Sequence, residues 1–180
     1  AVLDNALEAL VEHAYSGLSL IDDQASSEAD IRALLKGEVA ELEGIESNKH
    51  ACEEVYNYLD SSAAMGLHFT MTDIQSRYQD IPYGWREIDV AYVVAKLIHD
   101  QKVTIKHSGQ TIQPTDYQLI DFLRKKSETS YTSISIREII SASKMKNIKD
   151  ILKEYFEVMD VPSDEDGLVR FVVSKFSEEK

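Results

Sequence analysis

The stretch YGWREIDVAYVVAKLIHDQKVTIKHSGQTI, residues 83–112, decides the fold. From Trp85 to Gln101 its apolar residues cover more than half of a helix circumference, which predicts a largely buried helix. The segments KVTIKH and QTIQ follow as predicted strands, joined through the glycine-containing turn HSGQ. The stretch therefore predicts a buried helix followed by a β-hairpin.

The segments upstream complete a recognisable order of elements. Residues 48–65 have the apolar spacing of a helix, residues 67–71 alternate as a short strand does, and residues 72–79 read as a short capped helix. Pro82 disfavours helical angles at the residue before it and so indicates a turn. Helix, strand, helix, turn, helix and hairpin form the order of a winged helix-turn-helix, with residues 102–113 as the wing.

Further helices are predicted on both sides of this module. Residues 3–16 are amphipathic, and residues 26–37 predict a short helix with a serine cap and a terminal glycine. Residues 115–126 predict a capped helix, and residues 129–138 a strand whose nearest partners are the strands of the wing. Residues 142–159 predict a helix with one apolar side, and residues 162–176 a final helix capped by Ser163.

These elements predict a mainly α fold with a small amount of β structure, built around a central winged helix-turn-helix-like module with helical flanks. The predicted division is an N-terminal helical segment over 1–47, the winged module over 48–113 and a C-terminal α/β extension over 114–180.

The composition predicts a folded cytoplasmic protein. Hydrophobic residues make up 43% and charged residues 28% of the chain. No apolar run approaches the roughly 20 residues that cross a bilayer, and no signal-peptide pattern opens the chain. The single cysteine, Cys52, excludes an internal disulfide and is expected to pack as a small apolar residue, and the five histidines lack the spacing of ligands. We therefore expect neither a metal site nor a cofactor.

The net charge of −13 is unevenly distributed. Residues 1–69 hold 3 Lys and Arg against 14 Asp and Glu, residues 70–126 hold 8 against 7, and residues 127–180 hold 8 against 11. The first third is thus expected to repel a phosphate backbone, and the middle is close to neutral. Because the chain begins at Ala1, we expect it to be a piece of a longer polypeptide or a processed product.

Two interpretations of the winged module compete. As a DNA reader it would place the 85–101 helix in the major groove. Against this, Glu87 and Asp89 lie at the helix end that would enter the groove, and the module lacks a clear basic stripe. We therefore favour packing or protein contact, in which Trp85 anchors the turn and its N–H finds one acceptor. The candidate nucleic-acid or partner contacts are Arg86, Tyr92, Lys96, Lys102, Lys106, His107, Arg124, Lys125 and Lys126.

No catalytic motif is present. The sequence has no phosphate-binding loop, no G-x-S-x-G elbow and no G-x-G-x-x-G fingerprint, and it contains seven glycines in all. We therefore predict that the chain is not an enzyme in itself. A cryptic enzyme that uses acid pairs of the N-terminal region is a remaining, less favoured hypothesis.

Three segments carry a resemblance to a known family. PYGWREIDVAYVVAKLIHDQKVTI (82–105) is the specific one, and EADIRALLKG (28–37) and KEYFEVMDVPSDEDGL (153–168) support it. Together they resemble the large P-loop ATPases of bacterial phage-exclusion (BREX) systems, the BrxC/PglY family. The resemblance implies an internal region downstream of the nucleotide-binding domain, and a role in antiviral defence. The ATP-binding motif of that family is absent here, so no ATPase residue is carried over.

Two functions follow as the main hypotheses. The first is a non-catalytic interaction or regulatory module of a BREX-type ATPase that contacts other parts of the parent chain, other defence proteins or, non-specifically and weakly, DNA. The second is a stand-alone winged-helix transcriptional regulator that binds an operator as a dimer. Neither involves a membrane, and the sequence leaves the oligomeric state open.

Overall fold

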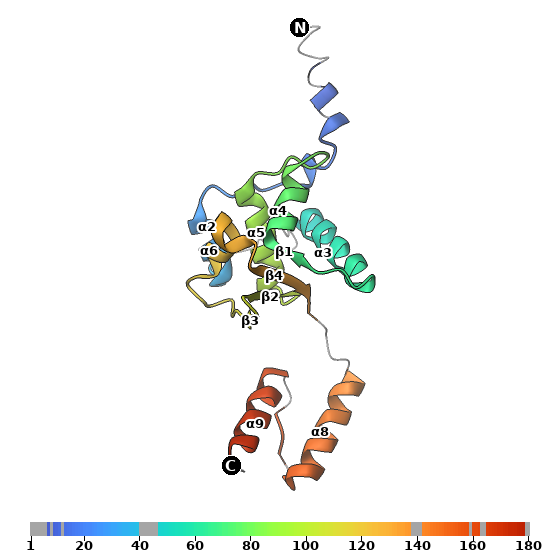
Figure 1. Cartoon of the computed structure of the whole chain (residues 1–180), viewed down its shortest axis with the longest axis vertical. Coiled ribbons are helices and arrows are strands. Elements are labelled where there is room, and N and C mark those ends of the chain that lie inside the picture. The colour runs from blue at the N-terminus through green and yellow to red at the C-terminus, as the bar shows by residue number, and fades with distance from the viewer. Residues whose placement is uncertain are drawn as a thin grey trace. The chain divides into compact units, whose positions relative to one another are not determined.

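The computed structural model in Figure 1 is mainly helical with one small sheet, as the sequence predicts. Contacts group the chain into two compact units, Ala1–Arg137 and Glu138–Lys180. The domain limits predicted after residues 47 and 113 stay predictions. The structure describes residues 7, 9–11, 13–39, 47–137, 142–158, 160–162 and 165–178.

Helical segments open the first unit. The described residues of the predicted 3–16 helix are helical as far as Ala14, and a 3₁₀ turn, η1 (Leu18–Leu20), follows. Helix α2 (Glu28–Leu35) begins at a capping box in which the Ser27 hydroxyl accepts from the backbone N–H of Ala29 and the Asp30 carboxylate accepts from that of Ser27. The predicted serine cap is confirmed.

The first two helices of the winged module are α3 (Lys49–Ala64) and α4 (Met71–Gln79). The predicted strand between them is shorter than expected, because β1 consists of Phe69 and Thr70 alone. Thr70 ends the strand by capping α4, in a capping box with Asp73. Cys52 is buried on α3 as predicted.

Helix α5 (Glu87–His99) forms the centre of the first unit, and it packs against α2, α3, α4 and α6. Ten of its 13 residues are buried, so the predicted inward-facing helix is confirmed. The helix is shorter than the predicted 85–101 at both ends. Arg86 is the N-cap, and Gln101 has a left-handed backbone (φ 57°) that ends the helical path.

Trp85 fixes the turn in front of α5. It is 2% exposed, its ring stacks on Tyr78 with centroids 4.6 Å apart, and its indole N–H donates to the carbonyl of Gly17 at 2.8 Å. Gly17 also lies against the Tyr83 ring so closely that a Cβ there would be 2.5 Å from Cδ1. The anchoring role predicted for Trp85 is confirmed, and it ties the N-terminal segment to the winged module.

The four strands form one antiparallel sheet in the order β1-β4-β2-β3, with β2 at Val103–His107, β3 at Gln110–Thr111 and β4 at Thr132–Ile136. Ile105 of β2 lies opposite Ile134 of β4, and both side chains are buried. Ser133 and Ser135 face outward, which gives β4 the alternation expected of a half-buried strand. The predicted pairing of β4 with a strand of the wing is confirmed.

The hairpin at 102–113 does not make the sheet by itself. Its second strand, β3, has two residues and lies at the edge, whereas β4 pairs with both β1 and β2. The connection from β2 to β4 therefore contains β3 and two short helices, α6 (Leu119–Arg124) and α7 (Lys126–Thr129). The predicted single helix over 115–126 is wrong, because the chain enters the helix at Leu119 and is extended at Lys125 (ψ 123°).

The second unit contains α8 (Ala142–Phe156) and α9 (Glu165–Glu178). The rings of Tyr155 and Phe156 on α8 meet those of Phe171 and Phe176 on α9. The predicted apolar side of α8 is incompletely covered, since Ile151 and Tyr155 are each 63% exposed. The predicted Ser163 cap lies outside the described residues.

Candidate nucleic-acid or partner interface

The nine candidate contact residues belong to three parts of the first unit. The first group belongs to α5 and its N-cap, the second to β2 and the residue before it, and the third to the junction of α6 and α7. In this order they are Arg86, Tyr92 and Lys96; Lys102, Lys106 and His107; and Arg124, Lys125 and Lys126.

The candidates within α5 face inward. Tyr92 is 6% exposed and Lys96 is 5% exposed. Burial, more than any nearby charge, raises the pKa of the Tyr92 phenol. Both side chains are therefore largely enclosed in the first unit.

Arg86 is held at the N-terminus of α5 by a carboxylate. Its guanidinium donates to both oxygens of Asp89, from Nε at 2.7 Å and from Nη2 at 2.8 Å, and Nη2 also donates to the carbonyl of Ala25 at 2.9 Å. The Asp89 carboxylate is buried and accepts from the backbone N–H of Ala25 at 2.9 Å. The hydrogen bond to Asp89 raises the pKa of Arg86. These contacts hold the loop before α2 over the helix end that a DNA reader would offer.

Arg124 joins three helices. Its Nε and Nη2 donate to the Glu87 carboxylate of α5, at 3.0 Å to Oε1 and 2.7 Å to Oε2, while Nη1 donates to Glu28 of α2 at 2.7 Å. The hydrogen bond to Glu87 is the main cause of the raised pKa of Arg124. Its neighbour Lys125 pairs with Asp121 at 2.7 Å. The contacts of Arg124 therefore lock α6 and α2 onto α5, and Lys125 and Lys126 are both exposed beside them.

His107 is the last residue of β2 and lies next to the hairpin turn. Its ring stacks on Phe122 of α6 at 4.0 Å between centroids, Nδ1 lies 3.0 Å from the Thr132 hydroxyl, and Nε2 lies 3.5 Å from the Glu128 carboxylate. Lys102 and Lys106, in contrast, are exposed. The hairpin thus offers two candidate cations to a partner, while the histidine fastens it to α6 and α7.

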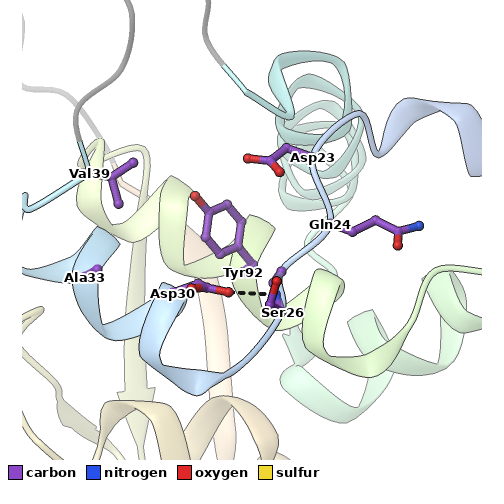
Figure 2. Close-up of a pocket in the computed structure, with 8 residues that line it drawn as sticks. Asp23, Gln24, Ser26, Asp30, Ala33, Val39 and Tyr92 are labelled. Carbon is purple, nitrogen blue, oxygen red and sulfur yellow. Dashed lines mark hydrogen bonds between the residues drawn. The ribbon is translucent and has the colours of Figure 1, made fainter.

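A pocket of about 260 Å³ opens where the loop before α2 faces α5. Figure 2 shows the Tyr92 ring projecting into it from α5, with Asp23 on the loop and Asp30 on α2. Asp30 already accepts from the backbone N–H groups of Ser26 and Ser27. The carboxylates of Asp23 and Asp30 line the same pocket and would repel a phosphate group. The pocket therefore does not have the chemistry of a nucleotide site.

The sequence did not indicate the role of Asn48, which holds the loop before α2 in place. Asn48, the N-cap of α3, is 1% exposed and has a left-handed backbone (φ 56°). Its side-chain oxygen accepts from the backbone N–H groups of Asp22 and Asp23 at 3.0 and 3.1 Å. Asparagine is one of the few residues that tolerate this backbone region, which is the signal that could have marked the position.

Comparison with protein families matches residues 17–138 to the winged helix-turn-helix domain of the BREX ATP-binding protein BrxC. The chain belongs to this family. The match covers the winged module, the α2 segment before it and the whole sheet, including β4. It places the chain in the BREX system, and it confirms the BrxC/PglY resemblance and the winged-helix fold class. No solved structure matches the chain significantly.

Within the described ranges, no group of three or more histidine, cysteine, aspartate or glutamate side chains is placed to hold a metal ion. Among the helices that the structure describes, none is long and apolar enough to span a membrane.

Proposed function

We propose that this chain is a non-catalytic interaction and regulatory module of a BREX-type ATPase, and that its winged helix is used for protein contact. The observation that carries the proposal is the enclosure of α5. In a helix-turn-helix that reads DNA, the corresponding helix enters the major groove with exposed side chains. Here α2 and α6 pack on α5, side by side in Figure 1, and ten of its residues are buried.

Electrostatics supports the same proposal. The N-terminal end of α5 carries Glu87 and Asp89, which are neutralised by Arg124 and Arg86 of the chain itself. Removing α6 to expose α5 would also remove Arg124 and leave the Glu87 carboxylate facing a phosphate backbone. Binding of a DNA duplex to α5 would therefore cost free energy twice, through the loss of packing around the helix and through repulsion between carboxylate and phosphate.

The proposal includes no reaction in this chain. Its partners are other parts of the parent ATPase or other proteins of the defence system, and any DNA contact is weak and made through exposed cations such as Lys102 and Lys106. The parent protein would supply ATP binding, as the name of the matched family says of BrxC. The proposal also places the chain in the cytoplasm, where ATP is present.

A titration of fluorescent random duplex DNA, followed by anisotropy at low and at near-physiological salt, tests the proposal. The expected result is no binding, or weak binding that falls steeply as salt rises, because phosphate contacts alone release counterions. Tight binding that survives near-physiological salt would overturn the proposal and favour a stand-alone regulator.

Paired variants locate any residual binding. Lys102→Glu with Lys106→Glu is expected to abolish it, because both side chains are exposed on the hairpin. Lys36→Glu is the matched control, since Lys36 is an exposed lysine that follows α2 and lies outside the hairpin. Loss of binding on substitution of Tyr92 instead, in a variant that keeps the parental fold, would show that α5 becomes accessible to DNA.

A further inference from the structure

The sheet of the first unit has an outward face as well as a buried one. Val103 and Ile105 of β2 and Ile134 of β4 point into the core. Because successive side chains of a strand alternate between the two faces, the residues between and beside these three point the other way. They form a surface that we call the open face, which consists of Lys102, Thr104, Lys106, Tyr131, Ser133 and Ser135.

Two backbone hydrogen bonds continue the β2–β4 ladder beyond the ends of the strands. The N–H of Ser108 donates to the carbonyl of Tyr131 at 3.0 Å, and the N–H of Arg137 donates to the carbonyl of Lys102 at 3.0 Å. Tyr131 and Lys102 therefore keep the alternation of the strands that they adjoin. Since Lys106 lies opposite Ser133, Tyr131 is its diagonal neighbour across the strands, at about 7–8 Å, which long side chains can span.

The two lysines of the open face are not neutralised by the described part of the chain. Neither Lys102 nor Lys106 forms an ion pair with a residue that the structure describes. Arg86, Arg124 and Lys125, in contrast, are each paired with a carboxylate. The open face includes no acidic residue, although the chain has 32 acidic residues against 19 Lys and Arg. It is therefore a local positive surface on an acidic chain, and it attracts an anionic ligand.

Tyr131 indicates which class of anion fits. The rings of Tyr78 and Tyr83 pack against Trp85, whereas Tyr131 is 65% exposed. An exposed aromatic ring beside cations suits a single-stranded nucleic acid, whose bases stack on the ring while its phosphates follow the cations. In a duplex the bases are already stacked on one another, so the same ring would meet only groove edges and phosphates. The hydroxyls of the open face can donate hydrogen bonds to phosphate or sugar oxygens.

We propose that the open face binds single-stranded nucleic acid. Tyr131 stacks on a base, and Lys102 and Lys106 contact phosphates of the same strand. The proposal goes beyond the protein contacts proposed above, and it uses a surface other than α5. The two proposals fail separately, because a single strand that does not bind leaves the enclosure of α5 unchanged.

Anisotropy of a fluorescent oligothymidylate of about 15 nucleotides, titrated with the complete chain, tests the proposal, and a random duplex of the same length is the comparison. The single strand is expected to bind at least about fivefold more tightly than the duplex at low salt, because only its bases can stack on Tyr131. Its affinity is expected to fall with a slope of about −1.4 in log K against log salt concentration, which corresponds to two phosphate contacts on a single strand.

Matched variants separate stacking from charge. Tyr131→Ala is expected to weaken binding at least about fivefold, and Tyr131→Phe to keep it, because stacking needs the ring and not the hydroxyl. Tyr117→Ala is the control, since Tyr117 is 79% exposed and lies outside the strands. Lys102→Ala with Lys106→Ala is expected to remove most of the salt dependence, whereas Lys36→Ala, an exposed lysine outside the sheet, keeps it.

The substituted side chains are all exposed, so the variants are expected to keep the parental fold, which the fluorescence of the buried Trp85 checks. No binding of the oligothymidylate at low salt, a duplex bound as tightly as the single strand, or an affinity that Tyr131→Ala leaves unchanged would each overturn the proposal. Equally tight binding of polyglutamate of matched charge would also overturn it, because the open face would then select negative charge without bases, as an acidic protein segment offers.

Discussion

Replacing Leu97 with aspartate tests how α5 supports the first unit. Leu97 is fully buried at the centre of the core. Losing its apolar side chain costs about 2–5 kcal/mol. Placing a carboxylate in the vacated space costs several kcal/mol more, even when the group takes up a proton, because the described surroundings are apolar. Since small domains are stable by about 5–15 kcal/mol in total, the variant is expected to be largely unfolded.

Trp85 provides the assay. It is the single tryptophan of the chain, and it is buried against Tyr78, so its fluorescence reports the environment of the core directly. The parent is expected to unfold cooperatively in urea with a change in tryptophan emission. Leu97→Asp is expected to show solvent-exposed emission already without urea, and no cooperative transition.

Asn57→Asp is the matched control, because it adds a carboxylate on the exposed side of α3. Its effect on the free energy of unfolding is expected to stay within about 0.5 kcal/mol, as for most surface substitutions. Equal urea midpoints for Leu97→Asp and the parent would refute the enclosed position of α5.

Three further predictions concern individual contacts. Arg124→Met is expected to lower stability by about 1–3 kcal/mol, and a double-mutant cycle with Glu87→Gln in urea unfolding should show that the two losses are not additive. Burial raises the pKa of the Tyr78 phenol above its ordinary value. Its contribution to stability is thus complete below about pH 10 and is lost as the pH rises through the pKa of the folded state, so Tyr78→Phe should raise the midpoint of alkaline unfolding measured by circular dichroism. Thr70→Ala removes the cap of α4 and is expected to cost about 1 kcal/mol, measured as a lower thermal midpoint; an unchanged midpoint would contradict the capping box.

Local signals in the sequence predicted most of the helices of the first unit. Ser27 has a side chain that caps a helix, and the dense apolar pattern after Trp85 predicts a buried helix. The cap of α4 was expected within residues 72–79, and the structure places it at Thr70 instead. These features depend on residues within a few positions of one another. They can therefore be predicted from the sequence without the tertiary structure.

The features that were missed depend on distant parts of the chain. The central place of β4 in the sheet follows from its second pairing, with β1, in which Phe69 lies opposite Ile134 although 65 residues separate them along the chain. The break at Lys125 follows from the turn that brings the chain to β4. Nothing in the alternation of β4 itself distinguishes a central strand from an edge strand. Long-range pairing of this kind leaves no local pattern to read.

In the candidate interface, too, local features could be predicted from the sequence and contacts between distant segments could not. Glu87 and Asp89 could be recognised from the sequence as unsuited to a DNA groove, because the argument needs only their charge and helix position. That Arg124 meets Glu87 and Glu28 could not be predicted, because these three residues come from separate segments. Tyr92 and Lys96 look like surface residues by type, and the packing of α2 encloses them.

A titration of the isotopically labelled chain with duplex DNA at low salt, followed by backbone amide chemical shifts, tests the enclosure of α5 most directly. We predict that the shifts of α5, including those of Tyr92 and Lys96, stay unchanged, and that any changes are confined to the exposed hairpin around Lys102 and Lys106. Shift changes concentrated along α5, with loss of the signals that mark its packing against α2 and α6, would contradict the account.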